Sequence, residues 1–206
     1  QPVCAGDLVV VAGAEGTVTA LDRNTGRRRW RALLGGRIHA SPTIAEGSIL
    51  VGCTDGTLSA LSAGDGALIW RYRIAPHDRH VMSYGHLESA WPVVCSPLVV
   101  DGIVYAAAGR PMSPGGYVIA LDVTTGKPKW MQSYVPYSGT DPPADDRMRL
   151  KDPAQQWVVP YGELALQGDR LIVRTRSSTG FAGLILDRNT GKPATKQTVY
   201  DHDLLY

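Results

Sequence analysis

The stretch GTVTALDRNTGRRRW, which runs from Gly16 to Trp30, decides the fold because the chain repeats it. Related copies are GTLSALSAGDGALIW from Gly56 to Trp70 and GGYVIALDVTTGKPKW from Gly115 to Trp130. A fourth copy, FAGLILDRNTGKPAT, runs from Phe181 to Thr195 and ends without a Trp. Recurrence of one segment at long intervals is the signature of a repeat architecture, so the fold is read from the unit that repeats.

Two features of the repeat predict how its copies dock on one another. The turn glycines are Gly26, Gly66, Gly126 and Gly191, and the residues four positions later are Trp30, Trp70, Trp130 and, in the last copy, Thr195. We expect each glycine to supply the positive φ that the turn requires. Each Trp should lie on an outer strand and stack on the neighbouring unit, where burial of so large a ring stabilises the contact.

Each copy follows a pair of apolar runs that a polar, glycine-containing turn separates. These pairs occupy residues 2–13, 41–52, 96–109 and 162–173. The whole unit therefore reads as a four-stranded antiparallel meander, which is the blade of a β-propeller. One such sheet cannot bury both of its faces, so the units must stack side by side. We predict an all-β fold, a single propeller segment over residues 1–206.

About four blades are expected, with extra sequence between them. We assign the blades roughly to residues 1–36, 37–76, 90–135 and 155–200, with insertions near 74–90 and 133–155. The offsets between turn glycines exceed what a bare blade of about 40 residues needs, and this excess indicates the insertions.

The pattern G-x-V-x-A-L-D-x-x-T-G-x-x-x-W resembles the repeat of the pyrroloquinoline-quinone-like (quinoprotein-like) β-propellers. That family includes quinoprotein alcohol dehydrogenases and a lipoprotein of the outer-membrane protein assembly machine. Residues 71–110 also resemble a segment of uncharacterised large propeller proteins from bacteria. The resemblance implies a ring of seven or eight blades, so four blades would form a partial ring or a fragment. It also implies export to the periplasm or the cell surface.

Composition and cysteine usage exclude several classes of protein. The net charge of +2 is too small for a nucleic-acid or membrane-surface field, and no apolar run is long enough to span a membrane. Three cysteines, Cys4, Cys53 and Cys95, are an odd number and contain no adjacent pair. Their small apolar neighbours favour buried free thiols. A Cys4–Cys53 or a Cys53–Cys95 bridge is the alternative.

The first insertion holds the best candidates for a functional site. Its possible metal ligands are His77, His80, His86 and Glu88, because imidazole and carboxylate groups bind zinc and other transition metals. A polar connecting loop, in which Tyr84, Glu88 and Trp91 pack over a neighbouring blade, is the simpler interpretation. A third possibility is that Tyr84 and Trp91 form a contact surface for a ligand or a protein.

The sequence favours a non-enzymatic role. It contains no GxSxG motif, and we predict no catalytic residue. A quinone site, as the resemblance implies it, uses adjacent cysteines, a metal and an Asp base, and this chain has no Cys–Cys pair. We therefore expect a scaffold that binds protein partners, with no cofactor. The alternatives are a quinoprotein dehydrogenase completed by further blades, and a divalent-metal or small-ligand site at 74–90. The partner could also be the remaining blades, or a second copy that closes the ring.

Overall fold

The computed structural model of the chain describes residues 1–110, 115–134, 159–177, 180–194 and 199–200. Within these ranges the strands form four sheets of four strands and one sheet of two. All neighbouring strands in the four large sheets are antiparallel and follow sequence order. The described residues contain no helix, and hence none that is long and apolar enough to cross a membrane. The all-β prediction is confirmed.

Each large sheet is one blade. The first blade contains β1 (Val3–Ala5), β2 (Leu8–Ala12), β3 (Thr17–Asp22) and β4 (Arg28–Leu33). The second contains β5 (Thr43–Ala45), β6 (Ser48–Gly52), β7 (Thr57–Ser62) and β8 (Leu68–Arg73). The third contains β11 (Leu98–Val100), β12 (Ile103–Ala108), β13 (Gly116–Asp122) and β14 (Pro128–Tyr134). The fourth contains β15 (Val159–Gln167), β16 (Arg170–Ser177), β17 (Gly180–Asp187) and β18 (Val199–Tyr200).

The structure describes one of the two expected insertions but not the other. The one expected near 74–90 contains the two-stranded sheet, β9 (His80–Ser83) and β10 (His86–Ser89). The one expected near 133–155 lies almost entirely outside the described residues.

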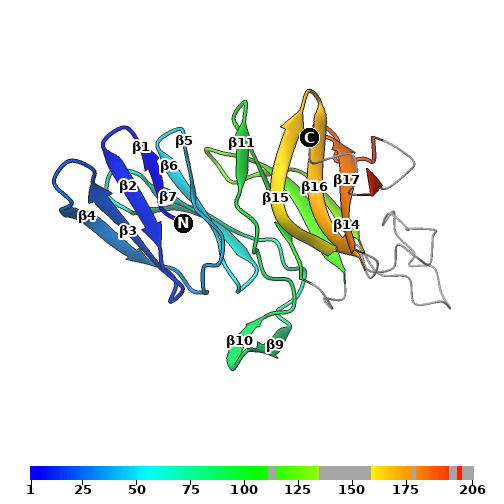
Figure 1. Cartoon of the computed structure of the whole chain (residues 1–206), viewed down its shortest axis with the longest axis horizontal. Coiled ribbons are helices and arrows are strands. Elements are labelled where there is room, and N and C mark those ends of the chain that lie inside the picture. The colour runs from blue at the N-terminus through cyan, green and yellow to red at the C-terminus, as the bar shows by residue number, and fades with distance from the viewer. Residues whose placement is uncertain (111–114, 135–158, 178–179, 195–198, 201–206) are drawn as a thin grey trace.

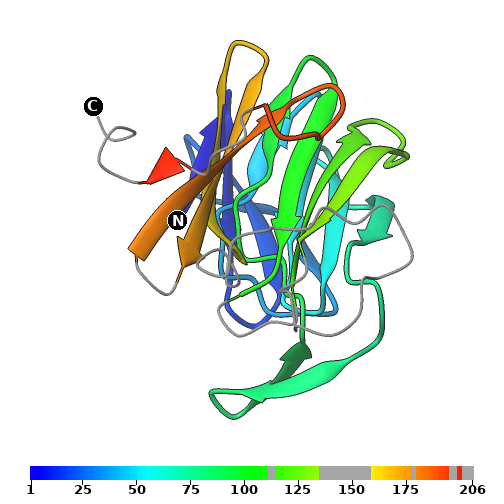
Figure 2. The same cartoon turned by 90° about the vertical axis from the view of Figure 1, so that its right-hand side faces the viewer.

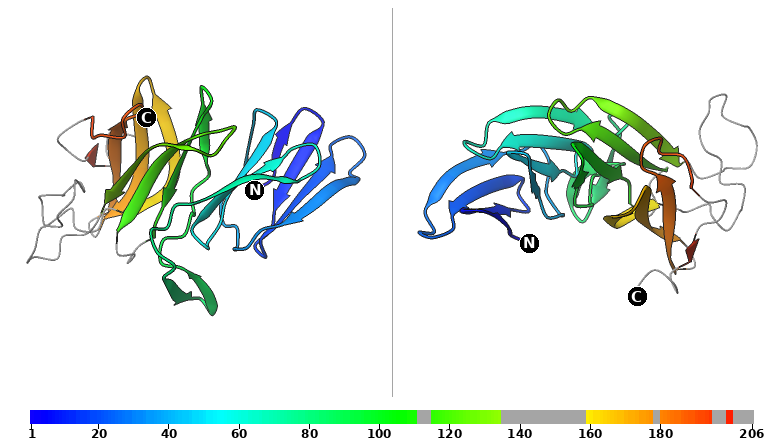
Figure 3. Two further views of the ribbon diagram at one scale, coloured as in Figure 1. Left: turned by 180° about the vertical axis from the view of Figure 1, so that it is seen from behind. Right: turned by 90° about the horizontal axis from the view of Figure 1, so that it is seen from above.

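The blades stand side by side in an arc, with the first and fourth blades at its opposite ends (Figure 3). The first strands of successive blades contact one another, β1 with β5 and β5 with β11, so these strands line the inner edge of the arc. This arrangement confirms the predicted partial propeller of four antiparallel blades.

The apolar core lies between blades rather than within them. From the first blade, Leu8 and Val10 pack against Ile49, Val51 and Leu61 of the second, and all five side chains are at most 6% exposed. Because alternate residues of a strand point to opposite faces, a blade that lies between two others packs one set of side chains against each neighbour. Full burial of such a side chain stabilises the folded chain by about 1.5–3 kcal/mol. The blades must stack because a single sheet cannot bury both of its apolar faces.

The repeated Trp residues fasten each blade to the next. The indole Nε1 of Trp30 donates to the carbonyl oxygen of Ala63 at 3.0 Å. In the same way Trp70 donates to Val123 at 2.8 Å, and Trp130 donates to Arg188 at 2.8 Å. All three acceptors occupy the same place in the repeat, directly after the third strand of the following blade. Each indole therefore docks on a turn of the following blade.

The turn glycines leave room for these indoles. A Cβ atom added at Gly66 would lie 2.5 Å from the ring of Trp30. The same atom at Gly126 would lie 2.6 Å from Trp70, and at Gly191 it would lie 2.4 Å from Trp130. Gly26 differs, because a Cβ there would meet no atom within 4 Å. Gly66, Gly126 and Gly191 are thus needed for close packing as well as for their backbone angle.

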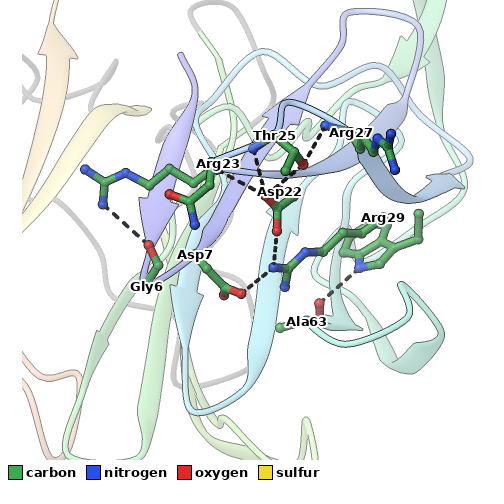
Figure 4. A network of polar contacts seen from close by, with 10 residues as sticks. Gly6, Asp7, Asp22, Arg23, Thr25, Arg27, Arg29 and Ala63 are labelled. Carbon is green, nitrogen blue, oxygen red and sulfur yellow. Dashed lines mark hydrogen bonds and ion pairs between the residues drawn. The ribbon is translucent and has the colours of Figure 1, made fainter.

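A polar network holds the turn in shape, as Figure 4 shows for the first blade. One carboxylate oxygen of Asp22 accepts hydrogen bonds from the backbone N–H and the hydroxyl of Thr25, both at 2.9 Å. The other oxygen accepts from Arg29 at 2.6 Å, and Arg29 also bonds Asp7. The Arg29 and Thr25 bonds hold the pKa of the Asp22 carboxyl well below its usual value, since they stabilise the charged form.

All three cysteines are free thiols, so neither proposed bridge forms. Cys53 and Cys95 are buried as expected, whereas Cys4 lies exposed on β1. Burial raises the pKa of the Cys53 thiol to about 12 and that of Cys95 to about 11.

Candidate functional site

A hairpin projects from the arc between the second and third blades, away from the stacked sheets (Figures 1 and 2). It consists of β9 and β10, in which His80 pairs with Ser89 and Met82 with Leu87. Tyr84 and Gly85 form its two-residue turn with φ angles of 48° and 80°. Positive φ at both positions is the geometry of a type I′ turn, whose twist matches that of the flanking strands.

The outer end of the hairpin presents apolar side chains to solvent. Met82 and Leu87 are a cross-strand pair on one face, and they are 72% and 67% exposed. Tyr84 at the tip is 99% exposed. Large apolar side chains gathered on a projecting element, without cover from the body, are typical of a contact surface. We call these three residues the hairpin tip.

The base of the hairpin is fixed by a buried carboxylate. Glu88 lies on the opposite face from Leu87, is only 6% exposed, and bonds Arg110 Nη1 at 2.9 Å. His39 Nε2 from the connection between the first two blades lies 3.6 Å from the other Glu88 oxygen. A buried charge is costly unless it is paired, so this arrangement ties the hairpin to two other parts of the arc.

Backbone hydrogen bonds reinforce the base. Ser89 N–H donates to the Thr54 carbonyl oxygen at 2.9 Å, and Ala90 N–H donates to Arg79 at 2.8 Å. The side chain of Val81 also packs against the main core cluster. The hairpin is therefore anchored at its base and free at its tip.

Trp91 is an anchor and not part of an exposed surface, which corrects the prediction that paired it with Tyr84. It is 5% exposed, and its ring meets His77 and Tyr117 edge-on at centroid distances of 6.2 and 6.1 Å. Its Nε1 is buried without a hydrogen-bond partner among the described residues. The sequence could not separate Tyr84 from Trp91, because which aromatic is covered depends on the path of the hairpin.

The four predicted metal ligands are not brought together. His80 and His86 lie on opposite faces of the hairpin, since His86 pairs with Ser83 and His80 with Ser89. His77 packs beside Trp91, while Glu88 is engaged by Arg110. In the described part of the chain, no group of three His, Cys, Asp or Glu side chains could hold a metal ion.

Sequence reasoning missed two partners of Glu88. His39 and Arg110 lie in different connections, 49 and 22 residues away, and neither stands in a recognisable motif. Only the stacking of three blades places them around one carboxylate.

Comparison with known proteins agrees with this architecture. Residues 1–159 match the sequence model of the family described as outer membrane protein assembly factor BamB. The BamB protein of Yersinia pestis is 30% identical over 135 residues, which are 63% of this chain and 32% of that protein. Quinohemoprotein alcohol dehydrogenase of Comamonas testosteroni is 26% identical over 172 residues, which are 76% of this chain and 23% of the enzyme.

Structural comparison shows the same fold. The crystal structure of BamB from Moraxella catarrhalis superposes with a TM-score of 0.65 at 22% identity, over 98% of this chain and 51% of that one. The chain spans about a third of the length of the Yersinia relative. Since the family match covers most of the residues and the blades share its repeat, the chain belongs to the BamB-like family of PQQ-repeat β-propellers.

Proposed function

We propose that this chain is part of a non-enzymatic, exported β-propeller scaffold, and that the hairpin tip is where it binds a protein partner. The proposal rests on a contrast in exposure within one short hairpin. Tyr84, Met82 and Leu87 are highly exposed, while Glu88, at most six residues away, is almost fully buried. An anchored base with an apolar, exposed end is suited to capture of a partner's apolar surface at little ordering cost.

Family membership supports the proposed role and compartment. The relatives include proteins named as outer membrane protein assembly factors, and the match to their family covers residues 1–159. A factor that assists assembly of other proteins needs recognition surfaces more than catalytic groups, and a propeller supplies rigid support for projecting loops. The location that we propose is the bacterial cell envelope.

Site-specific photo-crosslinking in the producing bacterium tests the proposal. A photoreactive amino acid replaces Tyr84, and a second variant carries it at Leu33, which is 73% exposed on the first blade. We expect a discrete protein adduct from position 84 and none from position 33. The double variant Met82→Ser/Leu87→Ser should abolish the adduct at 84 because it removes the apolar pair. Equal adducts from both positions, or none from 84, would contradict the proposal.

Quinone-dependent alcohol oxidation is the second candidate function. Its support is the 26% identity with a quinohemoprotein alcohol dehydrogenase over 76% of this chain. The described residues supply neither the adjacent cysteines nor the metal-ligand group that the resemblance implies, so other residues would have to build the site. Dye reduction with alcohols, after addition of quinone and calcium, tests this candidate. The absence of alcohol-dependent dye reduction by the full-length protein, with both additions present, would contradict it.

A further inference from the structure

The pairing pattern of the β9–β10 hairpin fixes which of its backbone groups point outward. A two-residue turn makes the strand residues that flank it a hydrogen-bonded pair, and every second pair below it is hydrogen-bonded too. The donation of Ala90 N–H to the Arg79 carbonyl oxygen at 2.8 Å follows this alternation. The intervening pairs, whose members do not bond each other, are Met82–Leu87 and His80–Ser89. Their N–H and C=O groups therefore point away from the hairpin.

The two outer edges of the hairpin differ in whether the body of the arc already uses them. On β10 the Ser89 N–H donates to the Thr54 carbonyl oxygen at 2.9 Å. On β9 no backbone group from elsewhere in the described ranges bonds His80 or Met82. The β9 edge thus offers two residues with outward donors and acceptors, directly beside the exposed Met82 and Leu87 side chains. We call the outward backbone groups of His80 and Met82 the open edge.

The side chains around the open edge indicate what an added strand would contain. His80 and Met82 lie on the same face of β9, so the residues opposite them would lie beside the exposed Met82 side chain. Arg79, which directly precedes β9, is exposed and has no ion pair among the described residues. The neighbouring carboxylate of Asp78 bonds Arg73 at 3.0 Å instead. A complementary strand therefore alternates apolar with polar residues and carries a carboxylate opposite Arg79.

We propose that the open edge binds an extended segment of the partner protein as a third strand, antiparallel to β9. This inference rests on the proposed binding at the hairpin tip and specifies the partner's chemistry there, namely alternating apolar residues and an acidic residue opposite Arg79. The segment's backbone would bond the outward groups of His80 and Met82. A two-stranded hairpin is only marginally stable by itself, so a third strand also orders the tip.

A second copy of this chain fits the open edge less well. If two β9 strands paired antiparallel about Val81, the outward groups of His80 and Met82 would match. That arrangement sets Ser83 of one copy opposite Arg79 of the other, and so leaves both arginines without a carboxylate. Charge complementarity therefore favours an acidic segment of different sequence over a dimer.

Hydrogen exchange detected by NMR tests the proposal on the 206-residue chain with a synthetic probe. The peptide Thr-Val-Thr-Val-Glu, with blocked ends, places its valines opposite Met82 and His80 and its Glu opposite Arg79. At a concentration that occupies about nine-tenths of the chain, the amides of His80 and Met82 should exchange about tenfold more slowly, because they exchange only while the peptide is dissociated. The Leu87 amide on the other edge should be unaffected. A peptide with Lys in place of Glu should bind about two- to fivefold more weakly.

Two controls separate backbone pairing from side-chain contact. A peptide with N-methylated valines keeps both side chains but cannot donate from them, so it should give no protection. Met82→Pro removes one outward N–H, which an edge strand tolerates, whereas Met82→Leu keeps it. We expect the unmethylated peptide to protect the His80 amide in the Met82→Leu chain and not in the Met82→Pro chain. Slow exchange of the inward-pointing Val81 amide checks that the hairpin stays folded in both.

The outcomes separate this inference from the proposed function. It is overturned if millimolar peptide protects neither His80 nor Met82, if the N-methylated peptide protects them equally, or if sedimentation shows a dimer that Met82→Pro dissociates. It is also overturned if the adduct from position 84 in the bacterium survives Met82→Pro, and the proposed function then still stands. Protection by the peptide without any adduct in the bacterium would support the open edge and contradict the proposed function.

Discussion

At the residue scale, a few side chains decide how the blades join. The tryptophans combine a large apolar ring with one donor, so a single residue both fills the space beside a glycine and satisfies a carbonyl oxygen. Trp70 shows this best, since it is 9% exposed and its bond to Val123 is buried. Both contacts recur at all three junctions between the described blades.

Loss of the Trp70 ring should be costly. We expect Trp70→Ala to destabilise the chain by about 3–5 kcal/mol, since it leaves a cavity between the second and third blades. It also leaves the Val123 carbonyl oxygen without its donor. Trp70→Phe should cost less because it retains most of the packing. Urea unfolding followed by circular dichroism measures both, and equal midpoints for the two variants would contradict the interpretation.

The turn aspartates make stability depend on pH. Bonds from Thr125 lower the pKa of the Asp122 carboxyl below its ordinary 3.8, and those from Thr190 do the same for Asp187. Because the folded pKa is the lower one, the stabilisation is complete above about pH 4 and is lost as the pH falls further.

Replacement of one aspartate tests whether the ionised carboxylate makes stability depend on pH. Asp122→Asn should lower the urea midpoint at pH 7, and its difference from the native chain should shrink as the pH falls from 4 to 2. Thr125→Val, which removes the hydroxyl bond to the same carboxylate, should weaken the pH dependence in part. A constant difference across this range would show that the carboxylate charge is not involved.

At the element scale, the β9–β10 hairpin is held at one end and free at the other. Its register puts Met82 and Leu87 on one face and Glu88 on the other, so one short element carries both the exposed tip and the buried anchor. A type I′ turn keeps the two strands twisted together beyond the support of the blades.

Removal of the anchor should loosen the hairpin. We expect Glu88→Ala to destabilise its base by about 1–3 kcal/mol, since it removes the buried carboxylate that ties the hairpin to Arg110. Trypsin should then cut after Arg79 faster than in the native chain, because the Arg79 carbonyl oxygen loses its ordered partner Ala90. His39→Ala is the control, and its effect should be smaller because His39 lies 3.6 Å from Glu88 and is half exposed. Equal cutting rates for both variants would rule out the anchor.

At the scale of the whole molecule, the blades are not equally protected. The second blade has a neighbour on both faces, and all five residues of β6 are buried. The equivalent strand of the first blade, β2, has one face packed and one face open. A propeller segment of this kind is expected to open from its uncovered end, as repeat proteins unfold through units with fewer neighbours.

Hydrogen exchange should reveal this gradient. Amide protons of β6 should exchange more slowly than those of β2, by a factor that mass spectrometry of peptides covering residues 8–12 and 48–52 can measure. Uniform exchange rates in the two strands would contradict the gradient.

The amino-acid sequence by itself determined the repeat, the four blades, the docking tryptophans and their turn glycines. These follow from local rules, namely strand alternation and turn chemistry, together with the fact that one sheet cannot cover itself. It also located the first insertion, but it placed Tyr84 and Trp91 together and grouped four metal ligands that the hairpin separates. The tertiary structure alone decided which aromatic is buried, how His39 and Arg110 meet Glu88, and that no indole packs against Gly26 as one does against the other turn glycines. Those outcomes depend on contacts between residues far apart in the chain, which no local pattern encodes.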